Sequence, residues 1–201
     1  MNVSLILGHP GTGSFCHAIA DAAQEALRAN SHAVIRHDLQ AEGFDPRIGG
    51  DEARTRVSSD PLVERHCAEL AAADGLIVVH PNWWGSPPAI VKGWIDRVIR
   101  PGVAYELAEG ADGARTMHVG KLRLRAALIF NPSDTPEQAE KTKFGNTLDI
   151  LWKTYIAELC GIRNMQRHVF SVMGTSTPEQ RAAWLEQTRT LVAQGFPADA
   201  A

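Results

Sequence analysis

A segment rich in glycine and small polar residues, His9-Pro10-Gly11-Thr12-Gly13-Ser14-Phe15-Cys16, separates an apolar run from a helical pattern. Backbone N–H groups are free at the start of a helix, and the helix dipole makes that end attractive to anions. The hydroxyls of Thr12 and Ser14 would add donors. The P-loop lysine is missing, so the segment predicts phosphate or pyrophosphate binding without nucleotide hydrolysis. A plain capped turn, with Ser14 as the N-cap, is the alternative.

A second segment, Pro81-Asn82-Trp83-Trp84, begins a proline-bounded loop that runs to Pro88. Two adjacent tryptophans are costly to expose to water, so they must be packed or must cover something flat. A planar isoalloxazine or nicotinamide ring would suit them. The alternative is that both rings close the core or a subunit interface.

A third segment, Asn131-Pro132-Ser133-Asp134-Thr135, offers polar side chains and backbone amides before a helix, although a capped turn explains it equally well. Cys16 stands where a thiolate would be stabilised, but no base is evident beside it, so we expect no nucleophilic role. We expect no metal site either, because five further histidines share no ligand spacing. They are His32, His37, His66, His118 and His168.

The three segments follow short apolar runs that alternate with helical patterns. The runs predict strands at 3–7, 34–35, 76–79, 126–130 and 169–173. Apolar residues at helical spacing predict helices around 15–27, 62–70, 90–99, 148–159 and 184–192. Asp60-Pro61 supplies an N-cap and an N1 proline for the second helix, and Thr-Pro-Glu-Gln at 135–138 and 177–180 predicts a capped helix start twice. Lys92, Asp96 and Arg97 are expected on or near the solvated face of their helix.

Five strands alternating with five helices predict an α/β fold, a doubly wound five-stranded parallel sheet with helices on both faces. Ligands of such sheets bind beyond the carboxyl ends of the strands, where the three polar segments would lie. Two segments, at about 41–59 and 102–121, lie outside the alternation. We interpret them as excursions from a single domain of residues 1–195, followed by a loose tail at 196–201.

The composition narrows the functional class. The chain has 201 residues, a net charge of -3 and a pI near 6.2, which gives no electrostatic basis for binding nucleic acid or an anionic membrane. Three distant cysteines without a CxxC pair suggest neither a disulfide framework nor a zinc site, and they suit a reducing cytosol. The N-terminus reads as a strand rather than a signal peptide, and no apolar run approaches the ~20 residues of a membrane span. A cytoplasmic protein is therefore expected.

In this order, the segments resemble the flavodoxin-like fold family of NAD(P)H:quinone oxidoreductases, which includes bacterial and animal quinone reductases and accessory reductases of potassium-efflux systems. The resemblance covers nearly the whole chain. It is strongest in Pro81-x-x-Trp84 and in the ungapped stretch Pro88-Ala89-Ile90-Val91-Lys92-Gly93-Trp94-Ile95-Asp96-Arg97-Val98. It implies a flavodoxin-like sheet of strand order 2-1-3-4-5, non-covalent FMN or FAD, NAD(P)H as cosubstrate and a homodimer.

The resemblance also implies roles for particular residues. Those expected at the flavin are His9, Ser14, Phe15, Cys16, Pro81, Asn82, Trp83, Trp84, Asn131, Pro132, Ser133 and Asp134. Tyr105 and Phe144 are expected at the substrate pocket, Tyr105 often across a dimer interface. The implied reaction is ping-pong: NAD(P)H gives hydride to the flavin and leaves, and a quinone or similar small electrophilic acceptor then receives two electrons.

Several residues depart from the family pattern. Cys16 replaces an asparagine, Asn131-Pro132-Ser133-Asp134 replaces Thr-Thr-Gly-Gly, and Leu107 replaces a second pocket tyrosine. Phe144 and Gln138 stand where animal quinone reductases have a histidine and a tyrosine proposed to relay a proton, so no catalytic side chain is expected. The alternatives are a one-electron flavodoxin-like carrier, a flavin-binding regulatory subunit of a transport system and a binding module that has lost its flavin. The residues specify neither the acceptor, nor NADH against NADPH, nor FMN against FAD.

Overall fold

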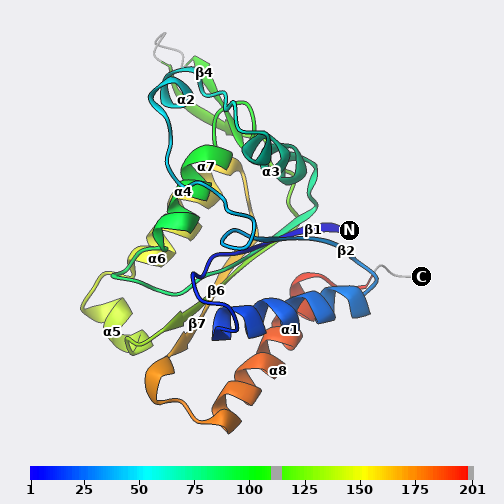
Figure 1. The fold of residues 1–201 in the computed structure, drawn as a ribbon, viewed down its shortest axis with the longest axis vertical. Helices are drawn as coiled ribbons and strands as arrows, with labels where there is room; N and C mark the ends of the chain where they lie inside the picture. The colour runs from blue at the N-terminus through cyan, green and yellow to red at the C-terminus, as the bar shows by residue number, and fades with distance from the viewer. Residues whose placement is uncertain (110–114, 199–201) are drawn as a thin grey trace.

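The computed structural model of the protein describes residues 1–109 and 115–198. Five parallel strands form its centre. The sheet has the order β2-β1-β3-β6-β7 (Figure 1). Its strands are β1 (Asn2–Leu7), β2 (Ala33–Asp38), β3 (Gly75–Val79), β6 (Ala126–Ser133) and β7 (Met165–Ser171). Counted along the chain, these parallel strands have the order 2-1-3-4-5, which confirms the predicted flavodoxin-like topology.

Helices cover both faces of the sheet because successive side chains of each strand point to opposite faces. In β3, Ile77 and Val79 pack toward α1 (Phe15–Ala29) and α8 (Pro178–Gly195), which lie side by side in Figure 1. Leu76 and Val78 face the opposite cluster. That cluster is covered by α3 (Pro61–Ala72), α4 (Ala89–Val98) and the segments α6 (Thr147–Asp149), η1 (Ile150–Ile156) and α7 (Ala157–Cys160). No helix in the described ranges is both long and apolar enough to cross a membrane.

Two of the three predicted helix starts are confirmed. Asp60 caps α3 by accepting a hydrogen bond from the backbone N–H of Leu62, and Thr177 caps α8 by accepting one from Gln180. The prediction at Thr135 is wrong: α5 (Glu137–Thr142) begins after Pro136 and has no side-chain cap. The same four residue types therefore begin a capped helix in only one of their two settings.

The excursion at 41–59 is tied to the domain by Arg97, which corrects its predicted placement on or near the solvated face. Its guanidinium is buried, with Nε and Nη2 each 2.9 Å from a Glu52 oxygen and Nη1 2.6 Å from the carbonyl oxygen of Asp45. Glu52 belongs to a short helix, α2 (Gly50–Thr55). Gly93 of α4 packs directly against the backbone of Pro46, so a larger side chain would not fit there.

The second excursion contains a two-stranded antiparallel sheet, β4 (Tyr105–Glu109) and β5 (Arg115–Gly120), which the sequence pattern did not predict. Two other predicted boundaries shift. The last parallel strand ends at Ser171 rather than 173, and Met173 belongs to a 3₁₀ turn, η2 (Met173–Thr175). The helix at 147–160 has a π-helical centre, and Tyr155, which was expected on its apolar stripe, is exposed.

Phe196 corrects the predicted loose tail. Its side chain is fully buried and lies against Gly75 at the start of β3, where an added Cβ would collide with the ring. Its carbonyl oxygen accepts hydrogen bonds from Asn30 and His32, at 2.9 and 3.0 Å. Residue 196 therefore belongs to the core, while residues 199–201 lie outside the described residues.

Candidate functional site

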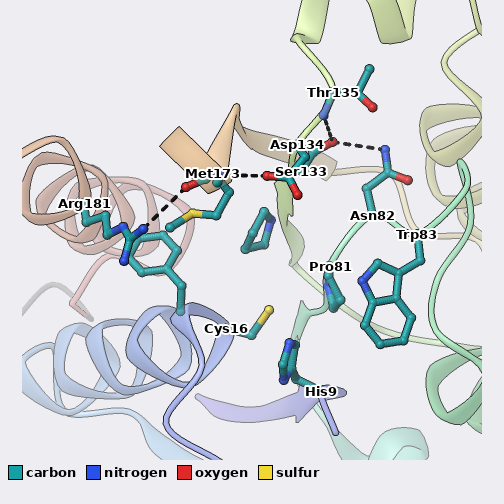
Figure 2. A pocket seen from close by; sticks show the side chains of 13 residues that line it. His9, Cys16, Pro81, Asn82, Trp83, Ser133, Asp134, Thr135, Met173 and Arg181 are labelled. Carbon is teal, nitrogen blue, oxygen red and sulfur yellow. Dashed lines mark hydrogen bonds between the residues drawn. The ribbon is translucent and has the colours of Figure 1, made fainter. Parts of the chain in front are cut away.

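Two adjoining cavities open beyond the carboxyl ends of the central strands, where ligands of doubly wound sheets bind. They have volumes of about 320 and 650 Å³ and share Asn82, Trp83, Asp134 and Thr135. The smaller cavity is shown in Figure 2. Its lining brings together all three predicted segments: His9, Phe15, Cys16, Pro81, Asn82, Trp83, Pro132, Ser133, Asp134, Thr135, Met173, Gly174 and Arg181.

The first segment forms the loop between β1 and α1. Phe15 and Cys16 begin α1 and line the smaller cavity, as does His9. Ser14 occupies the N-cap position, but its hydroxyl makes no cap hydrogen bond and lies 2.8 Å from Nδ1 of His17. Burial raises the pKa of the Cys16 thiol to about 12, so this cysteine is held in its neutral, non-nucleophilic form.

The second segment forms a two-residue turn. The backbone N–H and carbonyl groups of Trp83 and Ser86 bond to each other at 3.0 Å, and Trp84 and Gly85 have φ values of 57° and 71°. Positive φ at both central positions is the geometry of a type I′ turn, which normally selects asparagine and glycine. Trp84 adopts this strained backbone conformation. Its side chain is also fully exposed, at 102% of its reference area. The turn thereby places Trp84 in the lining of the larger cavity.

A buried polar network anchors this turn. The amide nitrogen of Asn82 donates to Glu140 at 2.7 Å, while its oxygen accepts from the N–H of Gly85 at 2.9 Å. Glu140 also accepts from the hydroxyl of Ser133 at 2.7 Å, and Arg167 binds its other oxygen at 2.8 Å. The Asn82 side chain therefore links this turn to Glu140.

The third segment differs from its predicted loop conformation because β6 continues to Ser133. Asn131 is fully buried in the strand and does not line either cavity, which corrects its predicted place at the flavin. Its amide nitrogen donates to the carbonyl oxygen of His80 at 2.8 Å, and its oxygen accepts from Arg167 at 2.6 Å. Pro132, Ser133 and Asp134 line the smaller cavity, and their contact with a flavin stays a prediction.

The cavities also contain residues that the sequence reasoning missed. Arg181 and Met173 complete the smaller cavity from α8 and η2, opposite Trp83 in Figure 2. Arg181 is held by the hydroxyl of Ser176 at 2.8 Å. The position of these two residues could have been expected, because the loop after the fifth parallel strand reaches the same edge of the sheet as the three predicted segments. Glu140 was missed because it lies inside a helix whose start was misplaced.

The two predicted substrate residues have different settings. Phe144 lines the larger cavity and is 54% exposed. Tyr105 begins β4, packs against one of the two core clusters and lines neither of the two cavities. Its predicted contribution across a dimer interface stays a prediction.

Two histidines with no common sequence spacing meet in the fold. The rings of His37 and His66 lie with their centroids 3.8 Å apart and tilted by 34°. Oxygens of Glu42 lie 2.9 and 3.0 Å from their ring nitrogens, so these three residues have the composition of a metal site. However, the indole N–H of Trp94 donates to Nδ1 of His66 at 3.0 Å. Nδ1 must then be unprotonated, Nε2 must carry the proton, and that nitrogen donates to Glu42 instead of binding a metal. The side chain of His118 lies outside the described residues.

The donor set of the smaller cavity fits a phosphorylated, flat ligand. Arg181 and His9 supply donors for an anion, and Trp83, Pro81 and Pro132 supply flat apolar walls. The lining carboxylate, Asp134, is occupied by the backbone N–H of Gly174 at 2.6 Å, which lessens its repulsion of a phosphate. These are the features that a flavin nucleotide requires.

Known proteins resemble this chain along nearly all of its length. NAD(P)H dehydrogenase (quinone) 1 of Rattus norvegicus is 27% identical over 90% of this chain and 73% of its own, and an uncharacterised NAD(P)H oxidoreductase of Haemophilus influenzae is 28% identical over 92% and 91%. The structure of an NAD(P)H:quinone oxidoreductase from Methanothermobacter marburgensis shares the fold, with a TM-score of 0.81, 22% identity and 98% coverage of both chains. A profile of the flavodoxin-like fold family matches residues 1–194, so the chain belongs to that family.

Proposed function

We propose that this protein is a flavin-dependent NAD(P)H oxidoreductase that reduces quinones or similar small electrophilic acceptors by two electrons. The observation that carries the proposal is the pair of joined cavities at the switch point of the sheet, one with anion donors and one with exposed aromatic rings. The names of the rat and Haemophilus relatives support the same reaction class. A bound flavin would supply the acceptance of hydride from NAD(P)H and the delivery of two electrons to the acceptor.

The chain's own residues would bind and orient the cofactor. The uncapped N-terminus of α1, His9 and Arg181 would hold the phosphate, whether of FMN or of FAD. Trp83, with the backbone of Asn82 and Pro132, would lie against the ring. The cosubstrate and the acceptor would then enter the larger cavity in turn, between Trp84 and Phe144.

Proton supply distinguishes this chain from the animal enzymes that it resembles. Phe144 cannot exchange a proton, and Glu140, which also lines the larger cavity, is paired with Arg167 and hydrogen-bonded by Asn82 and Ser133. The oxygens of this carboxylate are thus occupied by donors of the chain itself rather than open to a ligand. We therefore name no catalytic side chain and assign protons to solvent. Assembly as a homodimer and a cytoplasmic location belong to the same proposal.

The visible spectrum tests the proposal. Protein incubated with FMN or FAD and freed of excess ligand should keep a flavin absorbance, which NADH or NADPH should bleach without oxygen and a quinone should restore. Protein that retains no flavin refutes the flavin function. A bound flavin that neither nicotinamide bleaches refutes the reductase function and favours the electron carrier.

A further inference from the structure

A carbonyl group at the switch point of the sheet is bound by a side chain rather than by a strand. On the edge of β3 that faces β1, the carbonyl oxygen of Val79 accepts a hydrogen bond from the N–H of Gly8, at 3.0 Å. On the opposite edge, the N–H groups of His80 and Asn82 donate to carbonyl oxygens of β6, at 3.1 and 2.8 Å. Because backbone groups alternate between the two edges, the carbonyl of Pro81 lies on the β1 edge. The strand order reverses between β1 and β3, which is where ligands of such sheets bind.

His80 supplies the donor for this carbonyl. Nδ1 of its ring lies 2.8 Å from the carbonyl oxygen of Pro81, and the histidine is fully buried. The N–H of Asn82, on the other side of the same peptide unit, donates to the carbonyl oxygen of Pro132. Both polar groups of the peptide unit that joins Pro81 to Asn82 are therefore bound within the chain, although Pro81 lines the smaller cavity (Figure 2).

The tautomer of His80 is fixed by its other ring nitrogen. The indole N–H of Trp152 donates to Nε2 at 3.1 Å, and a nitrogen that accepts this bond carries no proton. The amide nitrogen of Asn131 lies 3.2 Å from Nε2 and 3.3 Å from Nδ1, but its bond of 2.8 Å goes to the carbonyl oxygen of His80. Burial is the main reason that the pKa of His80 falls to about 4, so the ring is uncharged at neutral pH. An uncharged ring with a bare Nε2 carries its proton on Nδ1, the nitrogen that faces Pro81.

We infer that His80 is a positioning residue that holds the Pro81 carbonyl in place, so that the cavity wall is already arranged for a flavin ring, an inference that rests on the proposed flavin site. A carbonyl that lost its donor would turn toward the cavity or bind water there, and a flat ring would have to displace that group. A wall whose polar groups are already bound avoids this cost, which is the advantage of preorganisation. His80 acts through Pro81, because the histidine itself lines neither of the two cavities.

Two variants of His80 separate positioning from a merely structural role. The side-chain amide of asparagine reaches the position of Nδ1, and that of glutamine reaches the position of Nε2. His80→Asn should therefore keep a donor for Pro81 and leave Trp152 without a partner, whereas His80→Gln should keep a partner for Trp152 and free the carbonyl. Each variant leaves one buried polar group unsatisfied, so urea denaturation should show similar losses of stability.

The riboflavin Kd, measured by fluorescence quenching, distinguishes the two variants. His80→Gln should raise the Kd about tenfold, the equivalent of one hydrogen bond, and His80→Asn should keep it within about twofold of that of the unchanged protein. Equal increases in the two variants would show that His80 acts only through stability, and no increase in His80→Gln would show that the carbonyl has no effect. Either result overturns the inference. Unchanged protein that binds neither riboflavin nor FMN refutes the proposed function itself, which is a different result.

Nuclear magnetic resonance of the unchanged protein gives a test that does not require either variant to fold. Imidazole ¹⁵N shifts distinguish a protonated ring nitrogen from a bare one. At neutral pH His80 should show a protonated Nδ1 and a bare Nε2, and both signals should persist when riboflavin is added, because the carbonyl of Pro81 keeps its donor. A bare Nδ1, in either the flavin-free or the riboflavin-bound protein, overturns the inference.

Discussion

At the residue scale, Arg167 supports the lining of the larger cavity through Glu140. Its guanidinium is 2% exposed and binds Glu140 at 2.8 Å, Asp149 at 3.1 Å and the side-chain oxygen of Asn131 at 2.6 Å. A buried carboxylate that loses its partner costs far more than a surface pair that is broken. The electrostatic cost of changing Arg167 therefore falls on Glu140, and through it on Asn82 and the tryptophan turn.

We expect Arg167→Met to lower the free energy of unfolding by about 3–5 kcal/mol, because it leaves Glu140 buried without its cation. Urea denaturation measures the change. Arg189→Met is the matched control, since Arg189 pairs with Glu25 and Glu186 at the surface, and it should cost less than about 1 kcal/mol. Equal losses in the two variants would show that the buried network carries no special stability.

At the element scale, the turn from Trp83 to Ser86 has a backbone conformation that lowers stability and presents Trp84 to the larger cavity. The turn bears a fully exposed tryptophan in the left-handed region, followed by Gly85, whose added Cβ would lie 2.6 Å from the hydroxyl of Thr147. Strain of this kind persists where it is useful. We therefore expect the ring of Trp84 to contribute to the binding of a ligand in the larger cavity rather than to the stability of the chain.

Trp84→Asn tests this trade-off by creating Asn-Gly, the dipeptide that a type I′ turn prefers. The free energy of unfolding should stay the same or rise by about 0.5–1 kcal/mol, because strain is relieved and no buried surface is lost. The KM for the quinone acceptor, measured by the oxidation of NAD(P)H, should rise roughly 2- to 12-fold through the loss of one aromatic contact in the larger cavity. A clear loss of stability would mean that the ring is packed after all.

The alternating elements were predictable because the local pattern of apolar residues specifies them. Asp60-Pro61 and Thr177 begin their helices as expected, and the five parallel strands stand in the predicted order. The failures involve partners that are distant in sequence. Arg97 is buried because Glu52, 45 residues away, meets it, and Asn131 is buried because β6 runs past the predicted loop. The cavity residue Arg181 escaped notice because the loop that precedes its helix, α8, carries no phosphate-binding motif.

At the scale of the whole molecule, two buried histidines each accept a hydrogen bond from a tryptophan. Trp94 donates to Nδ1 of His66, and Trp152 donates to Nε2 of His80 at 3.1 Å. The opposite nitrogen of His66 faces Glu42, and that of His80 donates to the carbonyl oxygen of Pro81 at 2.8 Å. Burial is the main reason that the pKa of each histidine falls to about 4.

These lowered pKa values predict acid sensitivity. Below about pH 6.5 the unfolded histidines bind protons that the folded ones refuse, so the stability present above that pH is lost as the pH falls toward 4. Each histidine can contribute a slope of at most about 1.4 kcal/mol per pH unit. Urea denaturation between pH 7.5 and 5 measures this slope, and His66→Gln should reduce it. Stability that does not change over that range would contradict the neutral assignment.

Both described ends of the chain lie at the amino edge of the sheet, opposite the cavities (Figure 1). His32 joins them, with the amino group of Met1 3.4 Å from one ring nitrogen and the carbonyl oxygens of Phe196 and Pro197 3.0 and 3.1 Å from the other. A tag or carrier protein fused at either end would therefore emerge away from the ligand entrance. Because the two described ends lie close together, a short peptide could join them in a circularly permuted variant.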